Sequence, residues 1–451
     1  MNEMFFIIVL VLIGLRSLYD LGMFVLSVVW LKRNVDTGRK TDEIKFTVVI
    51  TVLWEQYTLR ATVESLLRSS YTPNNLNVVI VTTEKEFTRS FEANTLSTVE
   101  LAMQLQSECP QRVHHLHYPY VTGAKAEQMN HAIDWLLSDL TLGDESMFVA
   151  FYDADSRPHP ETFRLVASLA QDSDRRVFQQ SAVFFQNFNK LRKGNGLIAG
   201  ALLQANAILQ TRWTLVHEIP RVLRQSFALR HWHKRIFLSH CVGHGLFLRK
   251  DLLREIQSIP AKTMTEDLFL GFILSLRGEP IQAVPVLESA DMPRSIVAAM
   301  RQKYVWYFGP FDHVVYAKHV IRDRLCRAPD WLTYVFAIKG LVPALAWLLS
   351  GWMILYVLVY PLVTQQSLAL ALSVGVLGMY VSTFVLTAGM HVWLKKLTGQ
   401  QVDVCPKGRI WALFWLVPML VIHGIPPIVS LVAKARSILT GVKPYKPKTE
   451  E

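Results

Sequence analysis

Cysteine is scarce in this chain, and this scarcity excludes two classes of protein. The sequence has 451 residues but only 4 cysteines, which stand far apart and form no Cys-x-x-Cys pair. With so few and scattered cysteines, we expect neither a disulfide-bonded framework nor a structural zinc site. Reduced thiols in a domain that faces the cytosol are the simpler interpretation.

Charged residues are also few, and basic ones outnumber acidic ones. Charged residues make up 18% of the chain against 51% hydrophobic residues, and the formal net charge is +11. A basic balance suits either nucleic acid or an anionic membrane surface. No DNA- or RNA-binding motif is present in the sequence, so we expect no nucleic-acid partner and assign the excess charge to membrane lipid.

Long apolar stretches at both ends of the chain predict a membrane protein. They are residues 4–31, 331–363, 367–393 and 410–432. Each is long enough to cross a bilayer, and the first is too long for a signal peptide and lacks its cleavage site. We expect an N-terminal transmembrane helix in residues 1–33, C-terminal transmembrane helices in residues 331–434 and a basic tail in residues 435–451.

Basic residues beside the first apolar stretch indicate the orientation of the chain. Lys32 and Arg33 follow it directly, and by the positive-inside tendency this end is cytoplasmic. The expected location is the plasma membrane, of the bacterial inner-membrane type, with the central domain in the cytoplasm. Arg16 and Asp20 stand four apart inside the stretch and can pair on one helix face. Pro426 allows a re-entrant hairpin in the last stretch, which leaves the side of the tail open.

The part between the membrane stretches, residues 45–330, has the pattern of a soluble α/β domain. The runs of strand type are residues 45–53, 76–82 and 148–152. Residues 59–68 have helical spacing, and strands that alternate with helices form a mostly parallel, Rossmann-like sheet. Residues 196–235 mix apolar, aromatic and basic positions, which is typical of interfacial helices on a membrane but also of ordinary surface helices.

Two carboxylates end the last of these strand-like runs and are the most informative residues of the chain. Asp153 and Asp155 stand one residue apart directly after residues 148–152. Burial of unpaired charge is costly, whereas Mg²⁺ prefers one or two carboxylates together with phosphate oxygens. The pair therefore predicts a cation site for a phosphate-bearing substrate, although an isolated Asp-x-Asp often marks only a turn.

Two other segments carry groups that suit a phosphate-bearing ligand. Lys125 stands among small residues and can approach a diphosphate as a point charge, although most such lysines are plain surface residues. Gly243 and Gly245 flank His244 in an apolar run. Glycine there permits the close approach of a ligand, or simply a tight bend of the backbone.

Two further segments carry groups that suit a sugar acceptor. Glu266 and Asp267 follow Thr265 at an expected helix start, where Thr265 can act as N-cap and the acids suit the helix dipole. Asp267 can alternatively accept a proton from a hydroxyl as a general base. Gln302 and Trp306 belong to an aromatic and basic segment that suits either a sugar ring or a membrane interface.

In their order along the chain, these segments resemble the membrane-integrated family-2 glycosyltransferases, the group that contains the cellulose, chitin and hyaluronan synthases. The resemblance covers about residues 45–310. It implies a GT-A fold for the catalytic domain and an inverting mechanism. It also implies a nucleoside-diphosphate sugar as donor, usually UDP-linked, and Mg²⁺ or Mn²⁺ as cofactor.

The resemblance also implies a role for each matching residue. Glu55, Lys125 and Asp153 would contact the nucleotide sugar, and Asp155 would hold the metal together with Asp153. Asp267 would be the catalytic base. The acceptor site would be lined by Gly243, His244, Gln302 and Trp306.

Three positions depart from the family pattern. Of the usual Pro-x-x-Asn-Glu after the first strand only Glu55 matches, and Thr82 and Thr83 stand where acids usually read the base. Val305 replaces the arginine of Gln-x-x-Arg-Trp, which removes a rigid bidentate donor. These departures leave the donor base and processive synthesis open.

Three functions remain to be weighed. The leading hypothesis is a membrane-bound transferase that synthesises or extends a polysaccharide, with accessory export subunits as further partners. Val305 favours the second hypothesis, non-processive transfer of one sugar to a lipid-linked acceptor. The changes at Thr82, Thr83 and Val305 motivate the third, an inactive partner subunit of a polysaccharide synthase.

Overall fold

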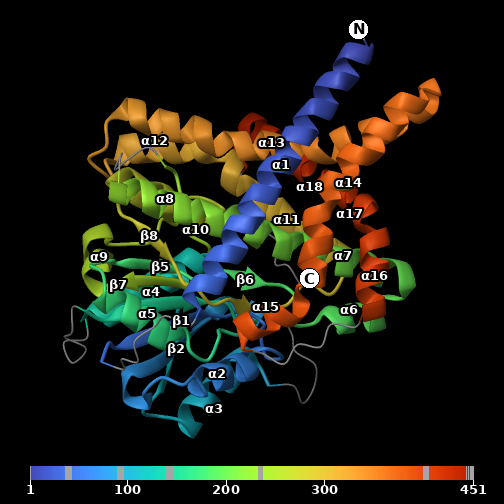
Figure 1. Ribbon diagram of the computed structural model, residues 1–451. Coiled ribbons are helices and arrows are strands. Elements are labelled where there is room, and N and C mark those ends of the chain that lie inside the picture. The colour runs from blue at the N-terminus through green and yellow to red at the C-terminus, as the bar shows by residue number, and fades with distance from the viewer. Residues whose placement is uncertain are drawn as a thin grey trace.

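The structure is a computed structural model that describes residues 2–35, 43–88, 96–138, 146–231, 237–399 and 406–442, with 444 and 446. A sheet domain occupies one side of the molecule, and a group of long helices crosses its other side (Figure 1). Within the described residues, four helices are long and apolar enough to cross a membrane, judged by length and composition.

The sheet domain is built on a seven-stranded sheet, counted over the described residues, with the strand order β3-β2-β1-β4-β7-β5-β8. The strands are β1 (Phe46–Thr51), β2 (Leu76–Thr83), β3 (Val113–Tyr118), β4 (Phe148–Tyr152), β5 (Val177–Gln179), β7 (Leu246–Arg249) and β8 (Ile281–Ala283). β7 runs antiparallel to β4 and β5, and the other pairs are parallel. The expected mostly parallel α/β sheet is therefore confirmed.

Helices cover both faces of this sheet because alternate strand residues point to opposite faces. Val48 and Ile50 pack against α2 (Leu59–Leu67), α3 (Thr98–Glu108) and α5 (Thr162–Gln171). Val49 packs on the other side, against α4 (Lys125–Ser138), α9 (Lys250–Ile256) and α10 (Glu266–Arg277). The central strands are buried on both faces, and for this reason they are continuous apolar runs in the sequence.

β3 is the strand that the sequence pattern did not reveal, so residues 148–152 form the fourth strand rather than the third. β3 lies at the edge of the sheet and only its first residue is fully buried. Three of its six residues are histidines, so it lacks the apolar run that marked its neighbours. A second, two-stranded sheet pairs β6 (Ala182–Val183) with β9 (Glu288–Ser289).

A layer of helices joins the sheet domain to the long apolar helices. It contains α6 (Phe188–Asn195), α7 (Leu197–Trp213), the π-helical turn η4 (Thr214–Glu218), α8 (Ile219–His231), α11 (Ile296–Phe311) and α12 (His313–Asp323). α7 is almost entirely buried after its first turn. The position of residues 196–235 at a membrane surface stays a prediction.

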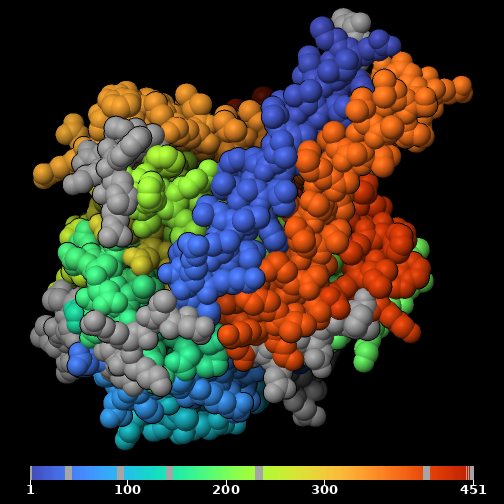
Figure 2. Space-filling model, in the orientation of Figure 1, coloured from blue at the N-terminus to red at the C-terminus, as the bar shows by residue number. Residues whose placement is uncertain are grey.

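The membrane helices come from both ends of the chain. The candidate spans are α1 (Asn2–Asn34), α13 (Asp330–Thr364), α14 (Ser367–Gly389) and the pair α17 (Leu416–Ile422) and α18 (Ile425–Thr440). Two short helices, α15 (His391–Thr398) and α16 (Pro406–Phe414), lie between α14 and α17 in the chain. The start of α1 and the α13–α14 turn project together from the molecule (Figures 1 and 2). At this end Gln366 Nε2 donates to Glu3 Oε1 over 3.0 Å.

The last apolar stretch is broken between α17 and α18, just before Pro426. The chain then returns to the sheet domain, where Lys434 Nζ lies 2.8 Å from Asp312 Oδ1 and Lys446 Nζ lies 3.2 Å from Glu266 Oε2. The sequence left the side of the tail open. These contacts place it on the side of the sheet domain.

A buried polar group ties three of these helices together. Arg16 Nε lies 2.9 Å from Asp20 Oδ1 within α1, as the spacing of the two residues predicts. Asp20 also accepts from Arg212 of α7, and Arg212 Nε donates to Thr383 Oγ1 of α14 over 2.7 Å. The carboxylate is thus shared by two arginines, which makes its burial tolerable.

Candidate functional site

A cavity of about 480 Å³ opens beside Asp153, directly after β4. Segments from across the whole chain line it, from Thr51 at the end of β1 to Lys446 in the tail. The candidate residues named from the sequence all line this one cavity: Glu55, Lys125, Asp153, Asp155, Gly243, His244, Asp267, Gln302 and Trp306. It lies at the carboxyl ends of parallel strands, where ligands of such sheets bind.

Lys125, the first residue of α4, lines the cavity. Its Nζ donates to Asp153 and to the carbonyl oxygen of Gly243, the latter over 2.8 Å. A Cβ on Gly243 would lie 3.2 Å from this Nζ, so a larger residue would crowd the amine. Burial lowers the pKa of Lys125, but the carboxylates of Asp153 and Glu266 outweigh it and raise the pKa, so the amine stays charged.

Asp155 is a half-buried carboxylate among other carboxylates. Burial, followed by the negative charges of Asp153, Asp291 and Glu55, raises the pKa of Asp155 well above its usual value. No cluster of three or more metal-ligating side chains exists among the described residues. A cation here would therefore need oxygens from a bound ligand, which fits the donor set that Mg²⁺ and Mn²⁺ share with phosphates.

Glu55 follows β1 at a strained turn. Trp54 before it has a φ of +56°, a left-handed conformation that is rare for a bulky residue. The buried carboxylate of Glu86 fixes this turn by accepting from the amides of Trp54 (2.8 Å) and Thr98 (2.9 Å). Strain of this kind gathers at functional sites, and here it sets the direction in which the chain enters the cavity.

Asp267 lines the cavity in the first turn of α10. Burial, followed by the negative charge of Glu266, raises the pKa of Asp267 to about 6. Burial alone would raise the pKa of Glu266 too, but Lys446 and Lys125 outweigh it and keep that pKa low. The pKa values of the two adjacent acids are thus shifted in opposite directions. Asp267, which has the higher pKa, suits a general base.

The expectation that Thr265 caps this helix was wrong for its side chain. Thr265 occupies the N-cap position, but its side chain makes no capping hydrogen bond. Its hydroxyl instead lies 2.7 Å from the Tyr316 hydroxyl of α12. This contact fixes the start of α10, and with it Asp267, against the helix layer.

His244 forms an ion pair that the sequence did not reveal. Its Nδ1 lies 2.5 Å from Oε1 of Glu288, which is fully buried in β9. Burial lowers the pKa of His244, but the Glu288 carboxylate outweighs it and raises the pKa to about 10. A second positive charge therefore lines the cavity. Gly245 has a φ of +61°, which suits a tight bend, and a Cβ at this position would lie 2.4 Å from the carbonyl oxygen of Gln180. Glycine therefore serves the backbone here.

The far wall of the cavity is aromatic. Gln302, Val305 and Trp306 of α11 line it, together with Trp347 of α13, one of the long apolar helices. Oε1 of Gln302 is buried and has no hydrogen-bond partner among the described residues, so it can accept from a ligand hydroxyl. Val305 offers no such group at the position where the family has arginine.

Some residues of the cavity escaped the sequence analysis, and the two threonines that depart from the family pattern do not line it. Trp213, Glu218, Arg221, Asp291 and Lys446 also line the cavity. None belongs to a recognisable motif, although Arg221 lies in the basic segment that was assigned to the membrane surface. Thr82 and Thr83 do not line the cavity. The Thr82 hydroxyl instead lies 2.7 Å from His115 Nε2 of β3.

Comparisons with known proteins add a family match. The model of the family "Glycosyltransferase like family 2" matches residues 44–309. The mannosyltransferase PcManGT from Pyrobaculum calidifontis, solved with GDP-Man and Mn²⁺, is 15% identical, with a TM-score of 0.45 over 93% of this chain and 99% of its own. Residues 1–349 of S. aureus TarS, solved with UDP-GlcNAc, are 12% identical, with a TM-score of 0.38 over 88% of this chain and 92% of theirs. No curated protein matches the chain at a significant level.

Proposed function

Because this chain belongs to the glycosyltransferase-like family 2, we propose that it is a membrane-bound, inverting transferase that builds or extends a polysaccharide from a nucleoside-diphosphate sugar. The main support is one cavity that joins carboxylates of metal-binding type, two cationic side chains, an acid with a pKa near 6 and an aromatic wall. UDP is the proposed nucleotide, and the plasma membrane with a cytoplasmic sheet domain is the proposed location.

The donor half of the cavity contains Asp153, Asp155, Lys125 and Glu55. Asp155, with Asp153, would hold Mg²⁺ or Mn²⁺, which supplies charge neutralisation for the leaving diphosphate when bound. Lys125 presents a charged amine beside them, and the protonated His244 adds a second cation. Fixed cations in the cavity stabilise a diphosphate that gains charge as its bond to the sugar breaks.

The acceptor half contains Asp267 and the aromatic wall. Asp267, ionised above about pH 6, would accept the proton of the acceptor hydroxyl. Trp306 would stack on a sugar ring, and Gln302 would accept from a ring hydroxyl. Attack on the anomeric carbon from the face opposite the diphosphate inverts that carbon.

Trp347 supports a polymeric product because it belongs to a long apolar helix. The cavity runs from β4 to this residue of α13, so a growing chain at Trp306 has a path toward the membrane helices. Accessory export subunits would then receive the product beyond the membrane.

One observation favours a second function, transfer of a single sugar to a lipid-linked acceptor. Val305 lines the cavity where the processive members of the family have arginine. A wall without that guanidinium holds a long polymer less firmly. The length of the product on a sizing gel separates the two functions.

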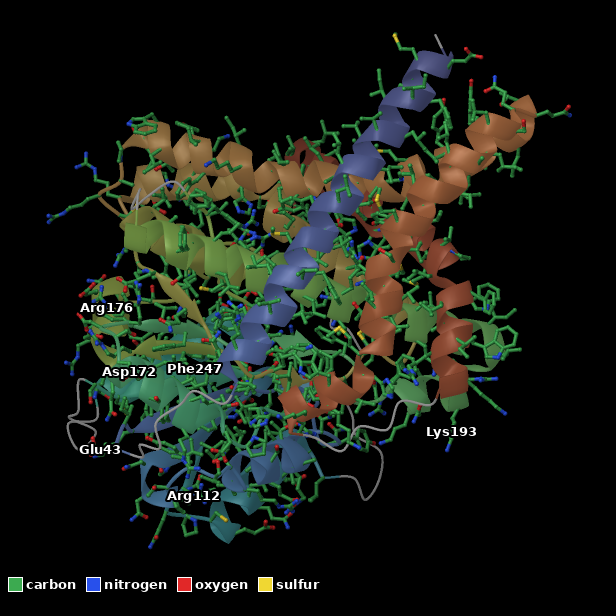
Figure 3. The ribbon with its side chains drawn as sticks, viewed as in Figure 1. Glu43, Arg112, Asp172, Arg176, Lys193 and Phe247 are labelled. Carbon is green, nitrogen blue, oxygen red and sulfur yellow. The ribbon has the colours of Figure 1, made fainter. Side chains whose placement is uncertain are left out.

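The test uses two matched carboxylate-to-amide changes in isolated membranes. Asp155→Asn and Asp267→Asn should each reduce the release of nucleoside diphosphate from the donor by at least 100-fold. Asp172→Asn is the control, since Asp172 is exposed at the outer edge of the sheet domain (Figure 3). Unchanged release in both cavity variants would refute the proposed catalytic residues.

A further inference from the structure

A second group of basic side chains lies where α1 passes η4 and α8, on the outer side of the cavity wall. We call Arg16, Arg221 and Arg224 the basic cluster. Arg16 Nη2 lies 2.8 Å from His217 Nε2, and Arg224 Nη1 donates to Tyr19 Oη over 2.6 Å. Arg221 precedes Arg224 by three residues on α8, so the two guanidinium groups lie on the same face of that helix. The cluster thus joins α1 to α8. The two residues between Arg221 and Arg224 in the sequence are apolar, so no acid separates the two arginines along α8.

The acids near this cluster do not balance its charge. Asp20 pairs with Arg16 but also with Arg212, so one carboxylate serves two guanidinium groups. Among the described residues Glu218 is a second acid close to the cluster, and its burial raises its pKa. His217 adds no charge, because burial and then the surrounding arginines lower its pKa well below the usual value. The cluster therefore carries excess positive charge in a partly buried place.

The cluster lies at the depth expected for lipid headgroups. The hydrogen bond between Glu3 and Gln366 marks the projecting, polar end of the long helices. Tyr19 lies roughly 25 Å from Glu3 along a straight α-helix, so a hydrocarbon core about 30 Å thick that begins at Glu3 ends close to Tyr19. α1 is longer than such a core, and its last residues, up to Asn34, continue past this edge toward the sheet domain. Tyrosine is enriched at such an edge. α1 lies on the surface there (Figure 2).

Apolar side chains surround the basic cluster on the outer surface. Leu15 and Leu18 of α1 are 61% and 57% exposed, and Phe227 of α8 is 68% exposed. Large exposed apolar side chains around a buried charge suit a ligand that has both a charged head and acyl chains. Arg16 itself keeps 44% of its side chain exposed, so the cluster is open to such a ligand.

Arg221 links the basic cluster to the catalytic cavity. It lines the cavity together with Trp213 and Glu218, and the Trp213 ring lies 4.2 Å from the ring of His217. The π-helical turn η4 lies between Trp213 and Arg221 in the chain. Such turns are rare in helices and are frequent at functional sites.

From this arrangement we propose that the basic cluster binds the phosphate group of a membrane lipid, at the edge of the catalytic cavity. Guanidinium groups bind phosphate oxygens with paired hydrogen bonds, and among the described residues Arg224 donates to Tyr19 Oη and to the carbonyl oxygen of Pro220 rather than to an acid. The acyl chains lie along the exposed apolar residues of α1 and α8. This site does not depend on the sugar donor or on the length of the product.

The test measures lipid retention by the purified full-length chain in detergent, using native mass spectrometry. Phosphatidic acid is titrated against phosphatidylcholine of the same chain length. The double variant Arg221→Gln/Arg224→Gln should bind phosphatidic acid on the order of 30-fold more weakly, from the contribution of two basic residues at an anionic surface. Arg436→Gln, a change of an exposed arginine near the end of α18, is the control and should bind like wild type.

Two further arms settle the source of the phosphate and the integrity of the variant. Inorganic phosphate at millimolar concentration should not displace the lipid, and efficient displacement would overturn a lipid site. If the glutamine variant unfolds, the variant Arg221→Lys/Arg224→Lys replaces it. This variant keeps both charges and should bind phosphatidic acid within about fivefold of wild type. Loss of binding in a folded lysine variant contradicts the proposal. Equal retention of phosphatidic acid by wild type and a folded glutamine variant also overturns it, as does equal retention of phosphatidylcholine by wild type.

Discussion

Replacement of Asp267 by asparagine is the sharpest test of the chemistry in the cavity. Asparagine has nearly the same shape, and its Oδ1 can still accept from the Leu268 amide, which now donates to Asp267 Oδ1 over 2.9 Å. The fold of α10 should therefore survive. Asparagine cannot take a proton at neutral pH, and loss of a positioned base lowers rates by roughly 10²–10⁴-fold, or about 3–5 kcal/mol in activation free energy.

The pH dependence of the rate adds a signature that a structural role would not produce. Burial and the neighbouring Glu266 raise the pKa of Asp267 to about 6, and the base acts only when ionised. kcat/KM of wild type should thus fall about tenfold per pH unit below pH 6 and level off above it. The small residual rate of Asp267→Asn should lack this acid limb.

The assay follows release of nucleoside diphosphate from a sugar donor between pH 5 and pH 8. Asp172→Asn, at the exposed edge of the sheet domain, controls for a general effect of charge removal and should keep the wild-type profile. A rate of Asp267→Asn within tenfold of wild type, or an unchanged limb near pH 6, refutes the assignment of Asp267 as the base.

Three other changes give distinct outcomes. Lys125→Met removes two hydrogen bonds from a charged amine and should raise the donor KM by roughly 10–100-fold with a smaller loss in kcat; an unchanged KM contradicts the donor role. Trp306→Ala should raise the acceptor KM by about 2–10-fold and leave nucleotide binding by calorimetry unchanged. Gly271→Ala should lower the free energy of unfolding by about 1–3 kcal/mol, and with it the unfolding temperature, because its Cβ would lie 2.4 Å from Cys241 N. Gly375→Ala is the control, because no atom lies within 4 Å of its added Cβ, and it should unfold at the wild-type temperature.

The candidate site could be predicted from sequence because its groups stand at the ends of elements with strong local patterns. Asp153 and Asp155 follow a continuous apolar strand, Lys125 begins an amphipathic helix, and Asp267 lies in the first turn of another. In a parallel sheet the carboxyl ends of strands meet at one edge, so these groups gather there. Their placement around one cavity is what this pattern predicts, and their roles stay predictions.

The parts that sequence reasoning missed depend on contacts between distant segments. Glu288 sets the charge of His244 from a two-residue strand that has no pattern of its own. Thr265 stands at a helix start as expected, but the Tyr316 hydroxyl takes its side chain. The side of the tail was open in the sequence because Pro426 allows a re-entrant hairpin, and the contacts of Lys434 with Asp312 and of Lys446 with Glu266 placed it.

Titration of UDP and GDP into the purified chain by calorimetry, with and without Mn²⁺, tests most directly that the cavity binds a nucleoside diphosphate through a cation at Asp155. We predict that wild type binds at least one of the two nucleotides in a Mn²⁺-dependent manner. We also predict that Asp155→Asn weakens this binding by at least about 100-fold, since it removes a charged ligand of the cation. Binding that is equally tight without Mn²⁺ or in Asp155→Asn, or no binding of either nucleotide by wild type, would contradict the proposed site.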